Sequence, residues 1–321
     1  MQVHRSLDQL PAFRNAVVTI GTFDGVHKGH QQIISGMKTV AREIGGETVI
    51  LTFHPHPRKI VRGAAEGVAL LNTLDEKIEL LARQGVDHLV VIPFTKDFSL
   101  LAAEEYIEQF LVRCFHPHTI IIGYDHRFGN NRLGDFRLLE EKSAQYEYQV
   151  REIPEQVLDA VKVSSTRIRE AILNGHPPLA ADLLGYPYFF EGRVVMGQQL
   201  GRTLGFPTAN LAVEDPEKLI PGNGVYAVWV EVSTPSAEGG RRSLPLLKGM
   251  MNIGVRPTVG GLGRVIEVHL LDFTGDLYDK TLRISLDTYL RAEQLFDGLD
   301  ALKAQLEKDR RSTIQHLTKT L

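Results

Sequence analysis

Several residue types and motifs are scarce in this chain. Cys114 is the only cysteine among 321 residues, which excludes an intramolecular disulfide and a metal cage made of cysteines. No run of about 18 apolar residues occurs, which excludes a conventional membrane-spanning helix. The first residues, up to Ala16, hold no apolar stretch of signal-peptide length. We therefore expect a cytoplasmic protein in a reducing setting, with no membrane partner.

The chain also lacks a large excess of positively or negatively charged residues. The 36 Lys and Arg residues against 39 Asp and Glu residues give a formal net charge of -3. This balance provides no global attraction to nucleic acid, so we expect no nucleic-acid partner. At roughly 150 residues per domain, the length predicts two domains. A change of pattern near Leu184 predicts that they comprise residues 1–184 and 185–321.

The first half alternates short apolar runs with amphipathic stretches. Buried strands separated by helices are typical of a parallel sheet of βαβ units, so we predict a Rossmann-like α/β domain. The apolar stripe of helix 74–84 predicts exposed positions for Glu76, Lys77 and Glu79. The predicted strands are 16–20, 48–53, 88–93 and 119–122, and the predicted helices are 29–44, 74–84, 103–112, 135–146 and 164–173.

The second half has a different pattern, which begins after the Pro- and Gly-containing stretch 174–187. Short segments rich in Val, Ile, Leu, Tyr and Phe are separated by Gly-containing turns, and a helix is predicted at 297–308. This pattern predicts a small antiparallel barrel with a terminal helix. The predicted strands are 188–195, 225–233, 244–253, 264–271 and 281–290.

The segment Gly21–His30, GTFDGVHKGH, joins the first of these strands to the first helix. Its glycines allow a tight turn and a close approach of backbone N–H groups to a phosphate, and a helix N-terminus adds positive charge. His27 and His30 are three residues apart and share one helix face. Two imidazoles there can stabilise charge on an α-phosphate as pyrophosphate leaves. The pattern favours adenylyl transfer, and a metal pair or two solvated turn histidines are the alternatives.

The barrel half opens with GRVVMGQQLGRTLGFPTANL, residues 192–211. The motif GxxxxGK(S/T) occurs nowhere in the chain, which excludes a P-loop kinase. Gly197, Gly201 and Arg202 can instead form a flap over phosphates, although a Gly-rich segment is also typical of a barrel corner.

Four polar residues of this half indicate a kinase. Thr208 and Asn210 face the same way in an extended strand, and their oxygens are hard ligands that suit Mg²⁺ together with waters and phosphates. Glu267 lies in the apolar strand VIEVHLLDF, where it is either on an exposed outer face or directed inward. An inward carboxylate can accept the proton of a hydroxyl that attacks a γ-phosphate. Arg291 is a candidate charge stabiliser.

These motifs carry a resemblance to a known family. GTFDGVHKGH resembles the GxFDGxHxGH signature of the HxGH nucleotidyltransferases, and the later segments TFHPHPR, GYDHRFGNNRLGD and VSSTRIREAI match further motifs of those enzymes. GRTLGFPTANL and IEVHLLDF, with GMMNIGVRPTVGG between them, are similar to riboflavin kinase. The order of the motifs resembles the prokaryotic bifunctional riboflavin kinase/FAD synthetase family.

The resemblance implies a two-step synthesis on a nucleotidyltransferase domain followed by a six-stranded kinase barrel. Riboflavin is phosphorylated by MgATP to FMN, and FMN is then adenylylated by ATP to FAD, so riboflavin, FMN, FAD, ATP and ADP are the implied partners. It also implies Mg²⁺ bound by Thr208 and Asn210, Glu267 as the catalytic base and Arg291 at the flavin. His27 and His30 are implied as the catalytic residues of adenylyl transfer. The implied nucleotide- and phosphate-binding residues are Gly21, Phe23, Asp24, Gly29, Asp125, Ser164, Ser165, Thr166, Arg167, Gly197, Gly201 and Arg202.

His126, Val255 and Ala292 depart from the family pattern, and Val255 stands where a threonine is usual. None of the three removes a group to which we assign chemistry. Two alternatives to the bifunctional enzyme are another HxGH nucleotidyltransferase and a binding protein that senses flavin or nucleotide. The first leaves Glu267 and the PTAN segment without a role.

Overall fold

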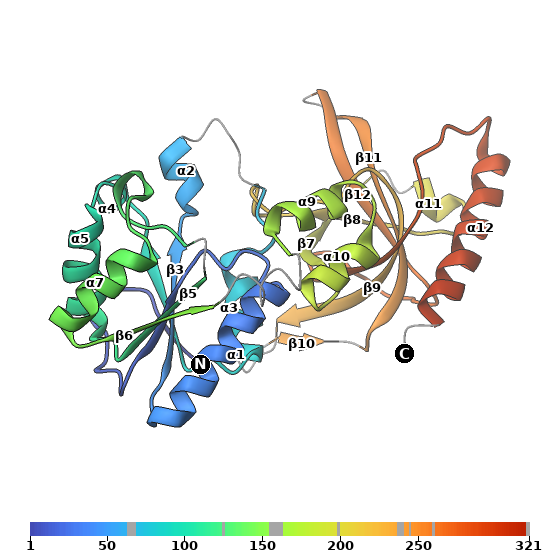
Figure 1. Ribbon diagram of the computed structural model, residues 1–321. Coiled ribbons are helices and arrows are strands. Elements are labelled where there is room, and N and C mark those ends of the chain that lie inside the picture. Colours follow the sequence, from blue (N-terminus) through green and yellow to red (C-terminus); the bar gives the residue numbers. More distant parts are fainter. Residues whose placement is uncertain are drawn as a thin grey trace. The chain divides into compact units, whose positions relative to one another are not determined.

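The structure is a computed structural model, shown in Figure 1. It describes residues 1–62, 69–123, 126–153, 163–197, 200–235, 241–243, 245–258 and 261–318. Contacts within the chain divide it into two compact units, Met1–Ser165 and Thr166–Leu321.

The first unit is built on a parallel β-sheet. Within the described residues its strands are β1 (Gln2–His4), β2 (Val17–Ile20), β3 (Thr48–His54), β4 (His88–Pro93), β5 (Thr119–Gly123) and β6 (Gln149–Ile153). They are arranged in the order β1-β4-β3-β2-β5-β6, and neighbours run parallel. The central strands are almost entirely buried, as expected when helices cover both faces. The strand order reverses between β2 and β5, and open α/β sheets bind their ligands at such a switch point.

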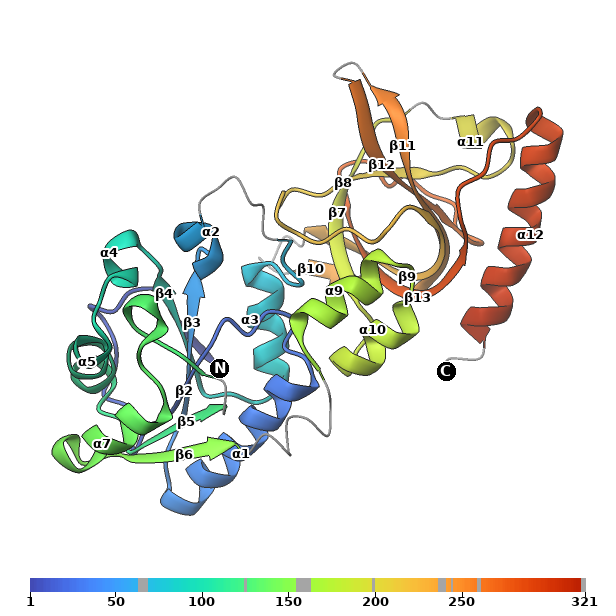
Figure 2. The same ribbon diagram turned by 45° about the horizontal axis from the view of Figure 1, so that its top comes forward.

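Helices cover the two faces of this sheet (Figures 1 and 2). One face carries α1 (Lys28–Ile44) and α3 (Leu74–Arg83), whereas the other packs Tyr106, Phe110 and Leu139 against alternate strand residues such as Val18 and Ile20. The helices of this second face are α5 (Ala103–Glu105), η1 (Tyr106–Val112), α6 (Arg113–Phe115) and α7 (Phe136–Tyr146). Shorter helices are α2 (Pro57–Arg62), α4 (Lys96–Ser99) and η2 (Asn130–Arg132).

The predicted α/β class is confirmed, with two differences in detail. β1 and β6 were not predicted, because both are edge strands and the half-exposed QVH and QVREI lack a continuous apolar run. The predicted exposure of two residues of α3 is wrong: Glu76 is 5% exposed and Lys77 is 7% exposed. Glu76 is buried by a capping box with Thr73. Lys77 donates to Thr52 on β3, a partner that the sequence of the helix alone cannot predict.

Six strands close into an antiparallel barrel in the described part of the second unit. They are β7 (Phe189–Val195), β8 (Ala209–Ala212), β9 (Gly224–Pro235), β11 (Leu247–Thr258), β12 (Gly261–Leu270) and β13 (Thr281–Arg291). The ring runs β9-β11-β12-β8-β7-β13 and closes through the pairing of β13 with β9. The short β10 (Arg241–Ser243) pairs with the end of β9. The predicted six-stranded barrel is thus confirmed.

The second unit also contains helices on either side of the barrel sequence. α9 (Ser165–Leu173) and α10 (Pro177–Leu184) precede it, α11 (Leu200–Thr203) follows β7, and α12 (Leu299–Thr318) ends the described chain. α10 packs on β13, and α12 packs along β9, β11 and β13 (Figure 2). The contacts therefore group α9 and α10 with the barrel and place the boundary at Ser165. The boundary expected from the sequence lies after α10, at residue 184. None of the helices in the described ranges is both long enough and apolar enough to cross a membrane.

Candidate active sites

The loop between β2 and α1 lies at the switch point of the first sheet. Phe23 and Val26 have φ values of 48° and 35°, and Gly25 has 89°. Left-handed backbone at residues other than glycine costs energy and persists where the surroundings impose it, most often at functional sites. The buried ring of Phe23 lies 4.9 Å from the ring of His30 and so helps to fix the histidine.

His27 and His30 are held together at the start of α1. His27 is the N-cap of the helix, and its Nδ1 accepts the backbone N–H of His30 at 3.4 Å. Because an accepting nitrogen carries no proton, a neutral His27 holds its proton on Nε2 as a donor. The two imidazoles stack at 3.7 Å between ring centroids, and Gly29 permits this, since a Cβ there would lie 3.2 Å from the His27 ring. Burial, and then the neighbouring His27 and Lys77, lower the pKa of His30 well below its usual value. The neutral ring of His30 and the stacked ring of His27 therefore stand at the positive end of a helix, where phosphate binds well.

Asp24 and Lys77 are two buried charged residues close to this loop. Asp24 is 1% exposed, and its Oδ1 accepts the backbone N–H groups of Leu71 at 2.9 Å and Asn72 at 3.3 Å. Lys77 Nζ donates to Thr52 Oγ1 at 3.5 Å. Burial lowers the pKa of Lys77 to about 8, against the opposing effect of the Asp24 carboxylate. The carboxylate of Asp24 thus holds the segment that leads into α3.

The other residues predicted for this site lie in several places. Ser165 donates its hydroxyl to the backbone carbonyl of Asp24 at 2.9 Å and ties the start of α9 to the loop. Asp135, which we did not assign to this site, caps α7 by accepting the backbone N–H of Leu138 at 3.2 Å. Asp125 lies outside the described residues. Three further side chains at the start of α9 are exposed: Ser164, Thr166 and Arg167.

The barrel unit contains a cavity of about 220 Å³. The predicted kinase residues Gly201, Thr208, Glu267 and Arg291 line it, and so does Asn252. The structure therefore brings together residues from the Gly-rich segment, β12 and β13, which are far apart in the sequence. Glu267 is partly buried and lies on the cavity side of β12, so it does not occupy an exposed outer face.

A row of polar residues crosses three strands, and two of its members, Glu267 and Asn252, line this cavity. Glu267 on β12 is the register partner of Asn210 on β8 and of Asn252 on β11. Directly opposed residues of antiparallel strands project to the same face. A carboxylate is therefore flanked by two amides, which is a suitable setting for orienting a hydroxyl and accepting its proton.

The Gly-rich segment passes close to this row. A Cβ at Gly197 would collide with the side-chain amide of Asn210, so the glycine lets this amide keep its position. Arg202 is exposed at the end of α11, and Gly201 reaches the cavity. The segment thus lies against the predicted metal ligand Asn210, as a phosphate flap would.

His269 supports the neighbouring segment from β12. It follows Glu267 by two residues and is buried, with Nδ1–H donated to the backbone carbonyl of Pro207 at 2.8 Å. Its ring also packs 5.3 Å from that of Phe206. Burial is the largest cause that lowers the pKa of His269, which keeps the ring neutral. His269 therefore holds the backbone directly before Thr208.

Arg291 closes the cavity against α12. Its Nε and Nη2 donate to Asp309 at 3.0 and 2.7 Å, and its Nη1 donates to the carbonyl of Ala292 at 3.0 Å. Gln305 also donates to Asp309, at 2.8 Å. The guanidinium lies at the cavity wall, but a large part of its donor capacity joins β13 to α12.

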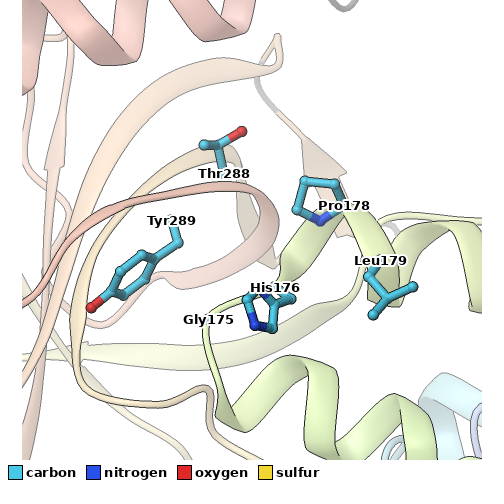
Figure 3. Close-up of a pocket in the computed structure, with 6 residues that line it drawn as sticks. All are labelled: Gly175, His176, Pro178, Leu179, Thr288 and Tyr289. Carbon is cyan, nitrogen blue, oxygen red and sulfur yellow. The ribbon is translucent and has the colours of Figure 1, made fainter.

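A second hollow of the barrel unit, of about 570 Å³, lies between the turn from α9 to α10 and β13 (Figure 3). It is lined by Gly175, His176, Pro178, Leu179, Thr288 and Tyr289. None of the residues predicted for catalysis lines this hollow, so we place neither reaction there.

The geometry defines a class of protein: a nucleotidyltransferase with its histidines at the switch point of a parallel sheet, joined to a barrel with a kinase-like cavity. The FAD synthetase family model matches residues 10–167, and the riboflavin kinase family model matches residues 184–317. The Escherichia coli K12 bifunctional riboflavin kinase/FMN adenylyltransferase is 38% identical over 95% of this chain and 93% of its own length. The enzyme of the same name from Haemophilus influenzae is 37% identical over 96% of this chain and 97% of its own length. A crystal structure described as a macrolide-efflux protein from Streptococcus pneumoniae has a TM-score of 0.83 at 30% identity, covering 97% of this chain and 98% of that one.

The chain belongs to the bifunctional riboflavin kinase/FMN adenylyltransferase family. It is an enzyme with two transferase activities, which phosphorylate riboflavin to FMN and adenylylate FMN to FAD with ATP. The resemblance stated from the motifs is thereby confirmed. A single-function nucleotidyltransferase does not account for the second half, and a binding protein without activity accounts for neither half.

Three residues of interest were missed in the sequence. Lys77 was placed on the exposed face because a helical period treats a charged residue as solvated. Asn252 gives no signal of its own, because only the strand register places it beside Glu267. His269 could have been predicted from the sequence, because it lies two residues from Glu267 in the same strand and therefore on the same face.

Proposed function

We propose that riboflavin is phosphorylated at the barrel cavity and that FMN is adenylylated at the loop between β2 and α1. The observation that carries the kinase assignment is the row formed by Asn210, Glu267 and Asn252, of which Glu267 and Asn252 line the cavity. For the second reaction it is the stacked pair of His27 and His30 at the N-terminus of α1.

In the kinase step, Glu267 accepts the proton of the riboflavin 5′-hydroxyl while the hydroxyl oxygen attacks the γ-phosphate of ATP. The new O–P bond forms as the bond to the ADP oxygen breaks. Asn252 lies beside Glu267 in the strand register, and its amide donates to Glu293 Oε1 at 3.5 Å. The backbone around Gly197 and Gly201, with Arg202, holds the ATP phosphates. Arg291 lies at the wall where the flavin enters.

Thr208 and Asn210 fit a magnesium ion that arrives with ATP. Their hydroxyl and amide oxygens are hard, neutral donors, and Gly197 leaves the Asn210 amide room that a Cβ would fill. A bound Mg²⁺ would neutralise charge on the transferring phosphate. Mg²⁺ keeps waters and phosphates among its ligands, so two protein donors suffice.

In the adenylyl step, a phosphate oxygen of FMN attacks the α-phosphate of ATP, and pyrophosphate leaves. His27 and His30 donate Nε2–H bonds to the charge that develops on the α-phosphate. Ser164, Thr166 and Arg167 are the further phosphate-binding residues that the resemblance of the segment VSSTRIREAI implies. Positioning and charge stabilisation suffice, so no covalent enzyme intermediate forms.

For function, we propose the domains 1–184 and 185–321. The chemistry at the start of α9 belongs with the loop of the first sheet, and the riboflavin kinase family match begins at residue 184. We further propose that the enzyme acts in the cytoplasm on small molecules, without a nucleic-acid or membrane partner. The net charge of -3 supports that part of the proposal.

Two variants of the purified chain test both assignments. With riboflavin and MgATP, Glu267→Ala should abolish FMN formation yet convert supplied FMN to FAD. His30→Ala should form FMN and stop there. Glu214→Gln, which removes a largely exposed carboxylate of the barrel unit, is the matched control and should keep both rates. Loss of both activities in both variants would contradict the assignment of separate sites.

A further inference from the structure

Lys77 is a buried cation that neither proposed reaction uses. It lies in the first turns of α3 and is 7% exposed. Burying an ammonium group is costly unless specific partners compensate. The partners of Lys77 belong to the strand and loop that build the adenylyl site.

Hydrogen bonds connect Lys77 to the histidine loop. Its Nζ donates to Thr52 Oγ1 at 3.5 Å, and Thr52 Oγ1 donates to the backbone carbonyl of Thr22 at 3.2 Å. Thr52 is itself fully buried on β3. The ammonium group is therefore attached, through one hydroxyl, to the loop that carries His27.

The nitrogen atoms of His30 give a second, independent observation. Within the described residues, His30 Nδ1 is a buried polar atom without a hydrogen-bond partner. A proton on that nitrogen would be buried without an acceptor and repelled by the positive charge of Lys77, which acts on His30. The lone pair is thus favoured on Nδ1, which leaves the proton on Nε2 as the donor.

We propose that Lys77 is a positioning residue for FMN adenylylation, because its positive charge, connected to the loop through Thr52, favours the lone pair of His30 on Nδ1 and the proton on Nε2, ready to donate to the ATP phosphates. The proposal rests on the adenylyl-transfer role of His30 given above. The titratable groups that face Lys77 are Asp24 from the loop and His30 from α1, while β3 contributes the non-titrating Thr52. On α3 itself, Glu76 is engaged with the backbone of Thr73.

The first test compares Lys77→Met with Lys38→Met. Lys38 donates to the carbonyl of Gln84 at 2.8 Å, so it binds the other end of α3 and is a matched lysine away from the loop. Lys77→Met should lower kcat of FMN adenylylation by about 10- to 100-fold, with a smaller change in KM for ATP, because it weakens an oriented donor. Riboflavin phosphorylation by the same molecule should be unchanged. Lys38→Met should retain both activities.

The second test is the pH profile of adenylylation. Lys77 holds its proton below a pKa of about 8 and loses it as the pH rises through that value. The rate should therefore fall on the alkaline side in the natural chain. Lys77→Arg keeps its charge, so this alkaline limb should move to higher pH.

Specific results would overturn the proposal. One is an unchanged kcat of FMN adenylylation in Lys77→Met. Another is a reduced kcat that is fully explained by a smaller folded fraction of the variant, so that the rate recovers when cooling restores folding. An alkaline limb that stays in place in Lys77→Arg would also overturn it, provided that the variant has a native melting temperature. These results differ from the one that would contradict the proposed function itself. That result is FAD formation by His30→Ala, which does not depend on the behaviour of the Lys77 variants.

Discussion

Asn210 and Glu267 are direct register partners on β8 and β12, and the same Glu267 faces Asn252 on β11. The segment PTAN and the strand VIEVHLLDF are more than fifty residues apart, yet barrel closure places their polar side chains in one row. The proposed kinase site is thus built from separate strands whose individual sequences show only a hydroxyl, two amides and one carboxylate. Changes to the backbone that supports the row should therefore affect phosphorylation without affecting adenylylation.

Gly197→Ala should impair the kinase selectively. The new Cβ would displace the Asn210 amide, so we expect KM for MgATP to rise about tenfold or more, with FMN adenylylation unchanged. Steady-state rates of ADP release at varied MgATP measure this effect. The matched control is Gly36→Ala on α1, where a Cβ meets only one side-chain carbon at 3.9 Å. A normal KM in Gly197→Ala would show that the amide does not contact the nucleotide or its metal.

His269 should act through the backbone of Pro207. His269→Leu removes the 2.8 Å hydrogen bond, and we expect KM for MgATP to rise more than kcat falls, because Thr208 loses its fixed position. His269→Asn can place an amide N–H where Nδ1–H was, and should restore most of the affinity. Equal effects of both substitutions would indicate that ring packing on Phe206, and not the hydrogen bond, is the important contact.

The bridge between Arg291 and Asp309 should contribute strongly to the stability of the barrel unit. Asp309→Asn leaves a buried guanidinium without its counter-charge, which costs about 3–5 kcal/mol in comparable cases. Replacing both partners, with Arg291→Met and Asp309→Leu, should recover much of that loss in urea unfolding. The exposed pair of Arg310 and Asp272 is the control, and Asp272→Asn should cost about 0.5 kcal/mol or less. A double variant as unstable as Asp309→Asn would contradict this explanation.

His30 should make the stability of the first unit depend on pH. Its pKa is lowered well below 6.5 by burial, so below pH 6.5 the unfolded chain binds a proton that the folded chain does not. The free energy of unfolding should therefore fall as the pH falls from about 7 to 5. The slope approaches about 1.4 kcal/mol per pH unit for one proton.

The comparison with His30→Gln isolates this contribution, because His4 and His269 also have lowered pKa values and act in the same direction. Denaturant midpoints between pH 5 and 7.5 provide the measurement. If the two curves run parallel, His30 is not the group that titrates in this range.

Local patterns predicted much of the architecture. The central strands of the first sheet are continuous apolar runs because both faces are covered, and α1 is preceded by a recognisable phosphate-binding turn. The edge strands β1 and β6 were missed because they are more exposed, and an exposed strand does not need a continuous apolar run. The terminal helix was predicted to end near residue 308, but α12 continues to Thr318 because it packs along the barrel strands.

By itself, the sequence determined the two fold classes, the reaction types and the identity of the residues with reactive groups, since these depend on local composition and motif order. Only the tertiary structure decided which groups meet. It buried Lys77 behind the histidine loop, used Asp24 to bind backbone amides, and joined Arg291 to Asp309. The reason is physical: the pKa and the partners of a charged side chain depend on burial and on neighbours from distant segments, and a local sequence pattern contains neither.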